Sequence, residues 1–247
     1  MGSNPASPTM CGRFVGSFRV ADLLDEIASE AAGAAVGVPD IDMGQVLLEN
    51  FNVAPTTDIP AISVGAGQLE IFSARWGLIP SWATEVKSGQ PLVNARSETV
   101  HEKPSFRGLI AKNRCIVPMS GFYEWDRTDP RVKKPYYVPR QDGHLMLCLG
   151  LFSRPKILDG GASVAILTTN SHDDLAPIHD RAPVQVDAAT AIMWLTDDEN
   201  PLSCVVGPMP LLAPYRVSPA VNSVRNNSSD LISPFRENVS SDGPLFG

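Results

Sequence analysis

Met10-Cys11-Gly12-Arg13-Phe14 places a thiol, a glycine and a cation directly after a methionine that could start translation. If Met10 and the residues before it are removed, Cys11 carries a free α-amine beside its thiol. Both groups can attack one aldehyde, because the amine forms a Schiff base and the thiolate then closes a thiazolidine ring. The alternative is that Cys11 is a small buried residue in a first strand at residues 13–15. The rest of the chain has to decide between these interpretations.

The composition predicts one β-rich α+β domain with flexible ends. The chain has 247 residues, of which 43% are hydrophobic, enough for a substantial core. Its 22 prolines and 19 glycines are spread along the sequence, which is typical of many short strands joined by loops. We expect residues 1–10 to be a leader or an added tail, residues 11–235 to be the domain, and residues 236–247 to be a C-terminal tail.

Local patterns predict where several elements lie. An amphipathic helix capped by Asp22 is expected to end near Gly33 or Gly37. A hairpin is expected around Gly65-Ala66-Gly67. A second helix start is expected at Ser97. Further strands are expected at residues 114–118, 135–138, 145–151 and 163–168, and a further helix at residues 188–195.

Charge and cysteine usage exclude several classes of protein. The net charge of −7 argues against a broad basic surface for nucleic acid, although a narrow basic groove remains compatible with it. Four cysteines lie far apart without a CxxC motif, so we expect neither disulfides nor a zinc site. With no long apolar run and no signal peptide, we expect a soluble, cytoplasmic protein with no membrane partner.

The loop at residues 75–82 contains two of the four tryptophans, Trp76 and Trp82. Bulky aromatic side chains in a loop broken by glycine and proline are candidates for stacking surfaces. Tryptophan is also usually buried, so both indoles could instead close the end of a barrel. The residues alone do not decide between these two roles.

Two titratable residues occur in unusual surroundings. Glu124 lies in the aromatic stretch at residues 122–125, where it either faces solvent on an alternating strand or is desolvated. A desolvated carboxyl group holds its proton more tightly and suits acid catalysis. His179 follows a turn-forming proline and precedes an acid–base pair, which is a loop position where an imidazole can titrate.

Five short strings together resemble the SOS-response-associated peptidase family. They are Met-Cys-Gly-Arg-Phe, Asn-Ala-Arg-Ser-Glu, Arg-Cys-Ile-Val-Pro, Gly-Phe-Tyr-Glu-Trp and His-Asp-Arg-Ala-Pro-Val, in this order between residues 10 and 184. The resemblance implies a single α+β domain with a distorted β-barrel core of mainly antiparallel strands and flanking helices. It also implies a protein of the DNA damage response that binds single-stranded DNA as a monomer and cross-links to abasic sites without a cofactor.

The resemblance further implies the residues of the site. Cys11 would be the nucleophile, Glu124 and His179 would supply protons for sugar ring opening and loss of water, and Asn94 would orient the amine or the sugar oxygen. The DNA path would be formed by arginines, tryptophans and a proline, namely Arg13, Arg96, Arg181, Trp76, Trp82 and Pro55.

One departure from the family pattern keeps alternatives open. In the family, cysteine directly follows the initiator methionine, whereas here nine residues precede Met10. An acylated Cys11 has no free amine, so the leader must be removed or translation must begin at Met10. Two other functions therefore remain: a thiol peptidase that removes its own leader with Cys11 and His179, and a single-stranded DNA-binding module without chemistry.

Overall fold

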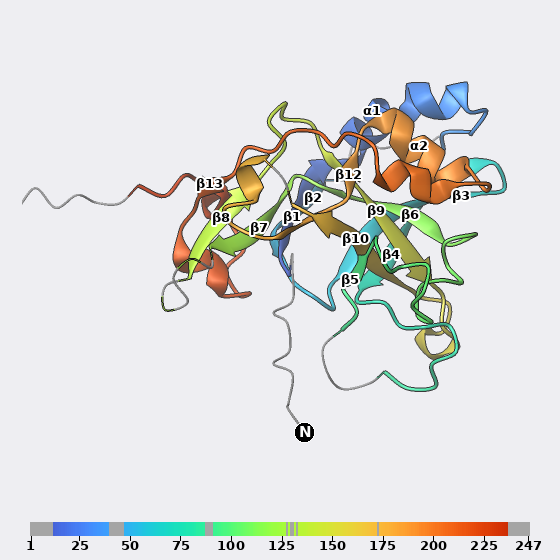
Figure 1. The fold of residues 1–247 in the computed structure, drawn as a ribbon, viewed down its shortest axis with the longest axis horizontal. Helices are drawn as coiled ribbons and strands as arrows, with labels where there is room; N and C mark the ends of the chain where they lie inside the picture. The colour runs from blue at the N-terminus through green and yellow to red at the C-terminus, as the bar shows by residue number, and fades with distance from the viewer. Residues whose placement is uncertain are drawn as a thin grey trace, which may run out of the picture.

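The computed structural model describes residues 12–39, 47–86, 91–126, 128, 131, 133–171 and 173–236. Cys11, the predicted leader and residues 237–247 of the predicted C-terminal tail lie outside the described residues. Within the described ranges the chain forms two α-helices and thirteen strands, arranged as two sheets (Figure 1). None of these helices is both long and apolar enough to cross a membrane.

The first sheet is antiparallel and includes the strand that begins at Phe14. In this strand, Phe14 pairs with Phe122 and Val15 pairs with Gly121. Only glycine fits at position 121, because a Cβ atom there would lie 2.6 Å from the Tyr137 ring. In spatial order the strands are β13 (Tyr215–Arg216), β8 (Lys134–Val138), β7 (Gly121–Asp126), β1 (Phe14–Arg19) and β2 (Leu47–Val53).

The second sheet closes on itself. Five strands form a ring because β10 pairs with both β4 and β9. Pairing is antiparallel except that β4 and β5 run parallel to β10. The strands are β11 (Arg181–Pro183), β10 (Ala162–Asn170), β4 (Gln68–Trp76), β3 (Asp58–Gly65), β6 (Arg114–Met119), β9 (Met146–Ser153), β12 (Gln185–Val186) and β5 (Asn94–Arg96).

The helices α1 (Val20–Gly33) and α2 (Ala188–Thr196) pack side by side on one face of this ring (Figure 1). The buried apolar residues form two large clusters, one on each face of β9. Because side chains alternate along a strand, Leu147 and Leu149 face the helices while Met146 and Cys148 face the other way. Short 3-10 helices complete the fold: η2 (Lys156–Leu158), η3 (Asp173–Leu175), η4 (Pro201–Val205), η5 (Pro219–Asn222) and η6 (Ser229–Ile232).

The predicted α+β class with mainly antiparallel strands is confirmed. The closed part of the second sheet is a ring of five strands. The hairpin between β3 and β4 and the helix at α2 are also confirmed. Two local predictions are wrong. Asp22 lies in the first turn of α1 and pairs with Arg19 instead of capping the helix. Residues 97–112 form turns, so no helix begins at Ser97.

Candidate active site

Glu124 is buried, with 3% of its surface exposed, so the solvent-facing interpretation is wrong. Strand alternation places it on the same face of β7 as Phe122, which belongs to the core inside the second sheet. Tyr123 and Trp125 point to the opposite face and belong to a separate cluster. The carboxyl group therefore lies in a desolvated position within a core of apolar side chains.

His179 is the described partner of this carboxyl group. Its Nε2 lies 3.7 Å from Oε2 of Glu124, and its side chain is also buried. The loop that carries it is fixed by the backbone, because the N–H groups of Ile178 and His179 both donate to the carbonyl of Leu175. The structure thus brings together two residues that are distant in the sequence and that were both predicted as site residues.

The neighbours of the imidazole fix the orientation of the ring. Nδ1 of His179 lies 3.0 Å from the backbone nitrogen and 3.2 Å from the carbonyl oxygen of Arg181. The carboxylate of Asp180 lies 3.2 Å from the same Nδ1. These contacts leave Nε2 facing Glu124.

The side chain of Arg181 forms its hydrogen bonds with other residues of the protein. Its buried guanidinium donates to both carboxylate oxygens of Glu98, to Asn170 and to the carbonyl of Thr168. This pairing holds the pKa of Glu98 below its ordinary value. The structure therefore does not support the prediction that Arg181 holds a phosphate, and its observed role is to fix β11 next to His179.

Asn94 and Arg96 lie on β5, on the other side of β10 from β11. Asn94 pairs with Ile166, and Thr168 lies between Arg96 on one side and Pro183 on the other. Because neighbouring strands are about 4.8 Å apart, the backbones of β5 and β11 are separated by about 10 Å. Arg96 is exposed, whereas Asn94 is half-buried.

Arg13 connects the beginning of the described chain to Glu124. Its carbonyl accepts a hydrogen bond from the N–H of Tyr123 over 2.9 Å. Continued by two residues beyond Phe14, the register of β1 and β7 brings Gly12 opposite Glu124. The Arg13 side chain is half-buried, which lowers the pKa of its guanidinium, and it donates to Asn52 and to the carbonyl of Val221.

The two tryptophans predicted to lie in one loop have different environments, because Trp76 ends strand β4 and only Trp82 lies in the loop that follows. Trp76 is completely buried, donates to the carbonyl of Val93 and packs edge-on against Phe14, so the prediction that it stacks on a base is wrong. Trp82 is 65% exposed. The indole of Trp76 is buried because it fills the core behind β1, and loop composition could not indicate this.

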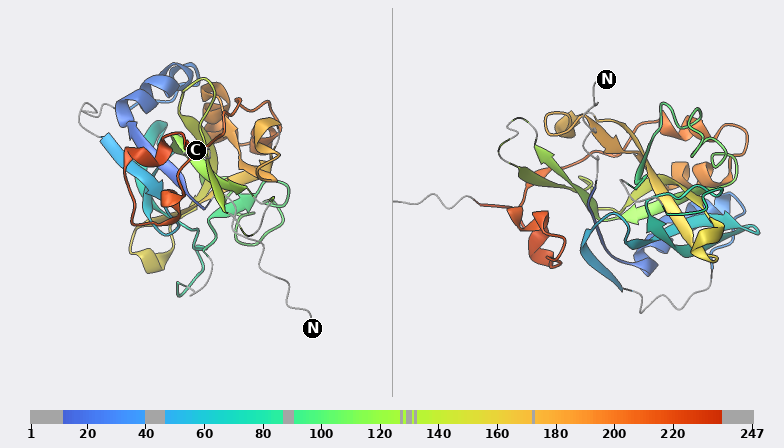
Figure 2. Two further views of the ribbon diagram at one scale, coloured as in Figure 1. Left: turned by 90° about the vertical axis from the view of Figure 1, so that its left-hand side faces the viewer. Right: turned by 90° about the horizontal axis from the view of Figure 1, so that it is seen from below.

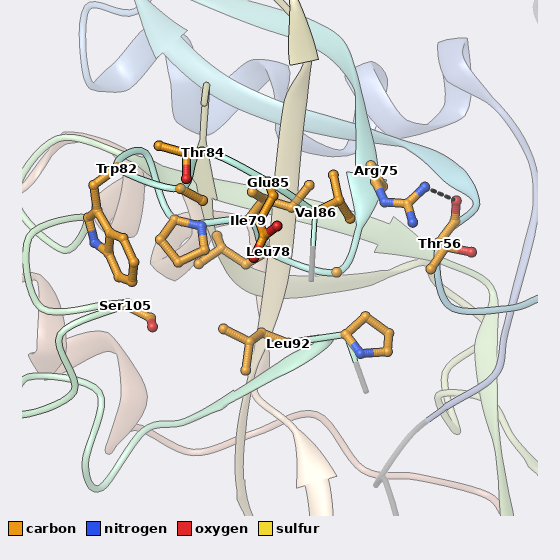
Figure 3. Close-up of a pocket in the computed structure, with 14 residues that line it drawn as sticks. Thr56, Arg75, Leu78, Ile79, Trp82, Thr84, Glu85, Val86, Leu92 and Ser105 are labelled. Atoms are coloured by element: carbon orange, nitrogen blue, oxygen red, sulfur yellow. Dashed lines mark hydrogen bonds between the residues drawn. The ribbon is translucent and has the colours of Figure 1, made fainter. Parts of the chain in front are cut away.

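Trp82 lies at one end of a pocket of about 520 Å³, and Arg75 and Thr56 lie at the other (Figure 3). The Arg75 guanidinium donates to the Thr56 carbonyl over 3.3 Å. The pocket is next in sequence to two predicted site residues, since Thr56 follows the half-buried Pro55 and Leu92 lies two residues before Asn94.

Three cysteines are buried: Cys115, Cys148 and Cys204. Burial raises the pKa of each of these thiols and keeps them protonated. Cys11, the predicted nucleophile, lies outside the described residues. Among the residues that the structure describes, no three His, Cys, Asp or Glu side chains are grouped so that they could hold a metal ion.

The sequence matches the SOS response associated peptidase (SRAP) family over residues 10–224. The chain belongs to the SRAP family. It is 33% identical over 235 residues to the abasic site processing protein YoqW of Bacillus subtilis, covering 90% of this chain and 99% of that protein. It is 28% identical over 234 residues to the abasic site processing protein YedK of Escherichia coli, covering 91% and 100% of the two chains.

A solved structure shares the fold. A crystal structure of a Bacteroides thetaiotaomicron protein aligns with a TM-score of 0.67 and 24% identity, covering 92% of this chain and 100% of that chain. This likeness confirms the fold.

Sequence reasoning did not identify Asn52 or Glu98 as parts of the site. Asn52 is 4% exposed and sits between two apolar residues of β2, and Glu98 binds the guanidinium of Arg181. Asn52 is one of three polar residues in β2, with Glu49 and Asn50, so the strand sequence alone does not single it out. Glu98 ends the Asn-Ala-Arg-Ser-Glu string, but its pairing with Arg181 could not be inferred because the two residues are 83 positions apart.

Proposed function

We propose that this SRAP protein processes abasic sites in single-stranded DNA by forming a covalent thiazolidine link through Cys11. Its relatives are abasic site processing proteins. The observation that carries the proposal is the buried Glu124–His179 pair, which lies beside the segment that directly follows Cys11. Since Cys11 is bonded to Gly12 and consecutive Cα atoms are about 3.8 Å apart, its reactive groups have a short path to this pair.

The chemistry needs proton transfers at two points. The abasic sugar is mostly a closed hemiacetal, and Glu124 as the acid would protonate the ring oxygen while the C1 hydroxyl loses its proton, giving the aldehyde. The Cys11 amine then adds to the aldehyde, and water leaves with proton transfer through His179. Finally the thiolate adds to the imine carbon, the nitrogen takes a proton, and the ring closes.

Single-stranded DNA would reach the site along residues that remain accessible. Arg96 is exposed and Arg13 has unused donors for phosphate, while Trp82 offers an indole for base stacking. Pro55 and Asn94 would contact the sugar region between them. We propose that a monomer acts in the cytoplasm during the DNA damage response.

The test compares three proteins on the same abasic oligonucleotide: the full chain, a chain that begins at Met10 with the methionine removed, and its Cys11→Ser variant. Intact mass spectrometry and denaturing gels after heating detect the adduct, and borohydride captures any imine. We expect a heat-resistant adduct from the processed chain alone. Cys11→Ser keeps its amine, so it should form an imine that borohydride traps and should cleave the strand by β-elimination. A heat-resistant cross-link from verified unprocessed chain would refute the thiazolidine mechanism.

A second candidate function is removal of the leader by the protein itself, and the ten residues ahead of Cys11 favour it. The Cys11 thiolate would attack the Met10 carbonyl, and water would hydrolyse the resulting thioester after the Cys11 amine has left. Full-length wild type and the variants Cys11→Ala and His179→Ala would be followed by intact mass over time. Loss of the first ten residues in wild type alone supports self-processing, and equal stability of all three proteins contradicts it.

A further inference from the structure

Asn52 forms a buried hydrogen-bonding centre between three parts of the chain. Its Oδ1 accepts from Nη1 of Arg13 over 2.8 Å. Its Nδ2 lies 3.2, 2.9 and 2.9 Å from the carbonyl oxygens of Val221, Ser223 and Asn226, respectively. A single carboxamide thus links the residue ahead of β1 with the segment that follows η5.

The C-terminal segment 218–232 covers the first sheet at the same place (Figures 1 and 2). Asn227 Oδ1 accepts from the N–H of Phe51 over 2.6 Å, and Asn222 Oδ1 accepts from Nε1 of Trp125 over 2.7 Å. Val221 and Leu231 pack in the cluster that includes Tyr123. The segment is therefore attached to β2 and to β7, the strand that carries Glu124.

The chemistry of the side chain explains why asparagine is needed at this position. A carboxamide offers an acceptor for the Arg13 guanidinium and two N–H donors for the carbonyls, which neither aspartate nor a hydroxyl residue can supply together. Both hydrogen bonds of Arg13 come from Nη1. Its other nitrogens keep a defined direction and remain available to a phosphate oxygen.

We propose that Asn52 is a positioning residue of the site: it fastens segment 218–232 to Arg13 and thereby sets both the Arg13 guanidinium and the chain ahead of it beside Glu124. The proposal rests on the proposed function, because the ligand of Arg13 is the phosphate of single-stranded DNA. It adds the C-terminal segment to the site, including Asn226 and Asn227, which lie beyond the residues matched by the family.

The test uses the processed Met10-start protein and the variants Asn52→Ala, Asn52→Asp, Arg13→Ala and Asn52→Ala/Arg13→Ala. Asn200→Ala, an exposed asparagine outside the site, serves as the matched control. Three quantities are measured: affinity for an undamaged single-stranded oligonucleotide, the adduct rate at saturating abasic oligonucleotide, and the thermal midpoint. The first readout does not depend on the covalent step.

We expect Asn52→Ala to weaken binding about tenfold, as for loss of a hydrogen bond to a charged group. In the Arg13→Ala background, the same substitution should weaken binding no further. Asn52→Asp retains the acceptor for Arg13 but loses the donors, so its thermal midpoint should fall while its affinity stays nearer to wild type. This separation of affinity from stability is not expected of a residue that only stabilises the fold.

The proposal is overturned if the two substitutions weaken binding additively, or if the thermal midpoint of Asn52→Ala falls while its affinity equals that of wild type. Should Asn52→Ala fail to fold, Asn227→Ala loosens the segment at an exposed contact and should cause a smaller loss of affinity in the same direction. Wild-type affinity in that variant then overturns the proposal. A wild type that binds the oligonucleotide but forms no adduct refutes the proposed cross-linking alone, since the coupling of Asn52 to Arg13 is still measured.

Discussion

The backbone N–H of Arg181 donates to Nδ1 of His179, and this contact orients the imidazole so that its Nε2 lies 3.7 Å from Oε2 of Glu124. The imidazole and the carboxyl group are therefore held next to each other before any substrate binds. Such an arrangement suits a reaction in which one group must give a proton and later recover it.

Glu124→Gln retains the shape of the side chain but removes the proton that opens the sugar ring in the proposed mechanism. We expect adduct formation to slow by about 10²–10⁴-fold with little change in DNA affinity, because the lost interaction belongs to the transition state. Single-turnover rates on an abasic oligonucleotide measure the effect. With a substrate whose aldehyde is already open, the variant should recover most of its rate, and equal slowing there would contradict the role in ring opening.

Trp76→Ala and Trp82→Ala are expected to affect different properties. The first removes a completely buried side chain and should cost about 3–5 kcal/mol of unfolding free energy. The second removes an exposed indole and should weaken single-stranded DNA binding of any sequence by about 1–3 kcal/mol, with stability almost unchanged. Denaturant unfolding and fluorescence anisotropy measure the two quantities. Unchanged DNA affinity in Trp82→Ala would remove this residue from the path.

Arg96→Ala should reduce the salt dependence of DNA binding. If Arg96 neutralises one phosphate, the slope of log affinity against log salt becomes less steep by about 0.7, the value for single strands. Anisotropy titrations at several salt concentrations give this slope, and Arg19→Ala, at an exposed arginine that pairs with Asp22, is the control. A slope equal to that of wild type would mean that no phosphate lies on Arg96.

Glu98→Gln should change how stability depends on pH. Because Arg181 lowers the pKa of Glu98 in the folded protein, the carboxylate stabilises the fold above its unfolded-state pKa of about 4.3. That contribution is lost as the pH falls through the lower pKa of the folded state. The difference in unfolding free energy between wild type and variant should therefore be present at pH 7 and shrink below about pH 4. A difference that stays constant over this range would contradict the assignment.

Local patterns were sufficient for the fold class but not for the surroundings of individual side chains. The β3–β4 hairpin follows from Gly65-Ala66-Gly67 because turn chemistry is local. The burial of Glu124 cannot be predicted from the sequence of its strand. Alternation assigns each residue to one of two faces, but packing against distant residues determines which face is shielded from solvent. Trp76 was misassigned for the same reason, because the ring that covers it, Phe14, is 62 residues earlier in the sequence.

The candidate site shows the same limit. His179 and Glu124 could be named from motifs, yet their contact and the orientation of the imidazole depend on a hydrogen bond from Arg181. Arg181 itself was expected on the DNA path, and its burial against Glu98 depends on the meeting of β11 with the turn after β5. Pairing across such sequence separations cannot be inferred from composition or spacing.

The hydrogen bond from Arg13 to Val221 spans 208 residues. On a ribosome that adds about 5–20 residues per second, Val221 is synthesised about 10–40 s after Arg13. A nascent chain therefore exposes its N-terminal strand long before the segment that secures it has been made. Folding dominated by such distant contacts is slow. Under the proposed mechanism, a free Cys11 amine and thiol would meet cellular aldehydes during this interval, so removal of residues 1–10 only after folding would prevent premature capping.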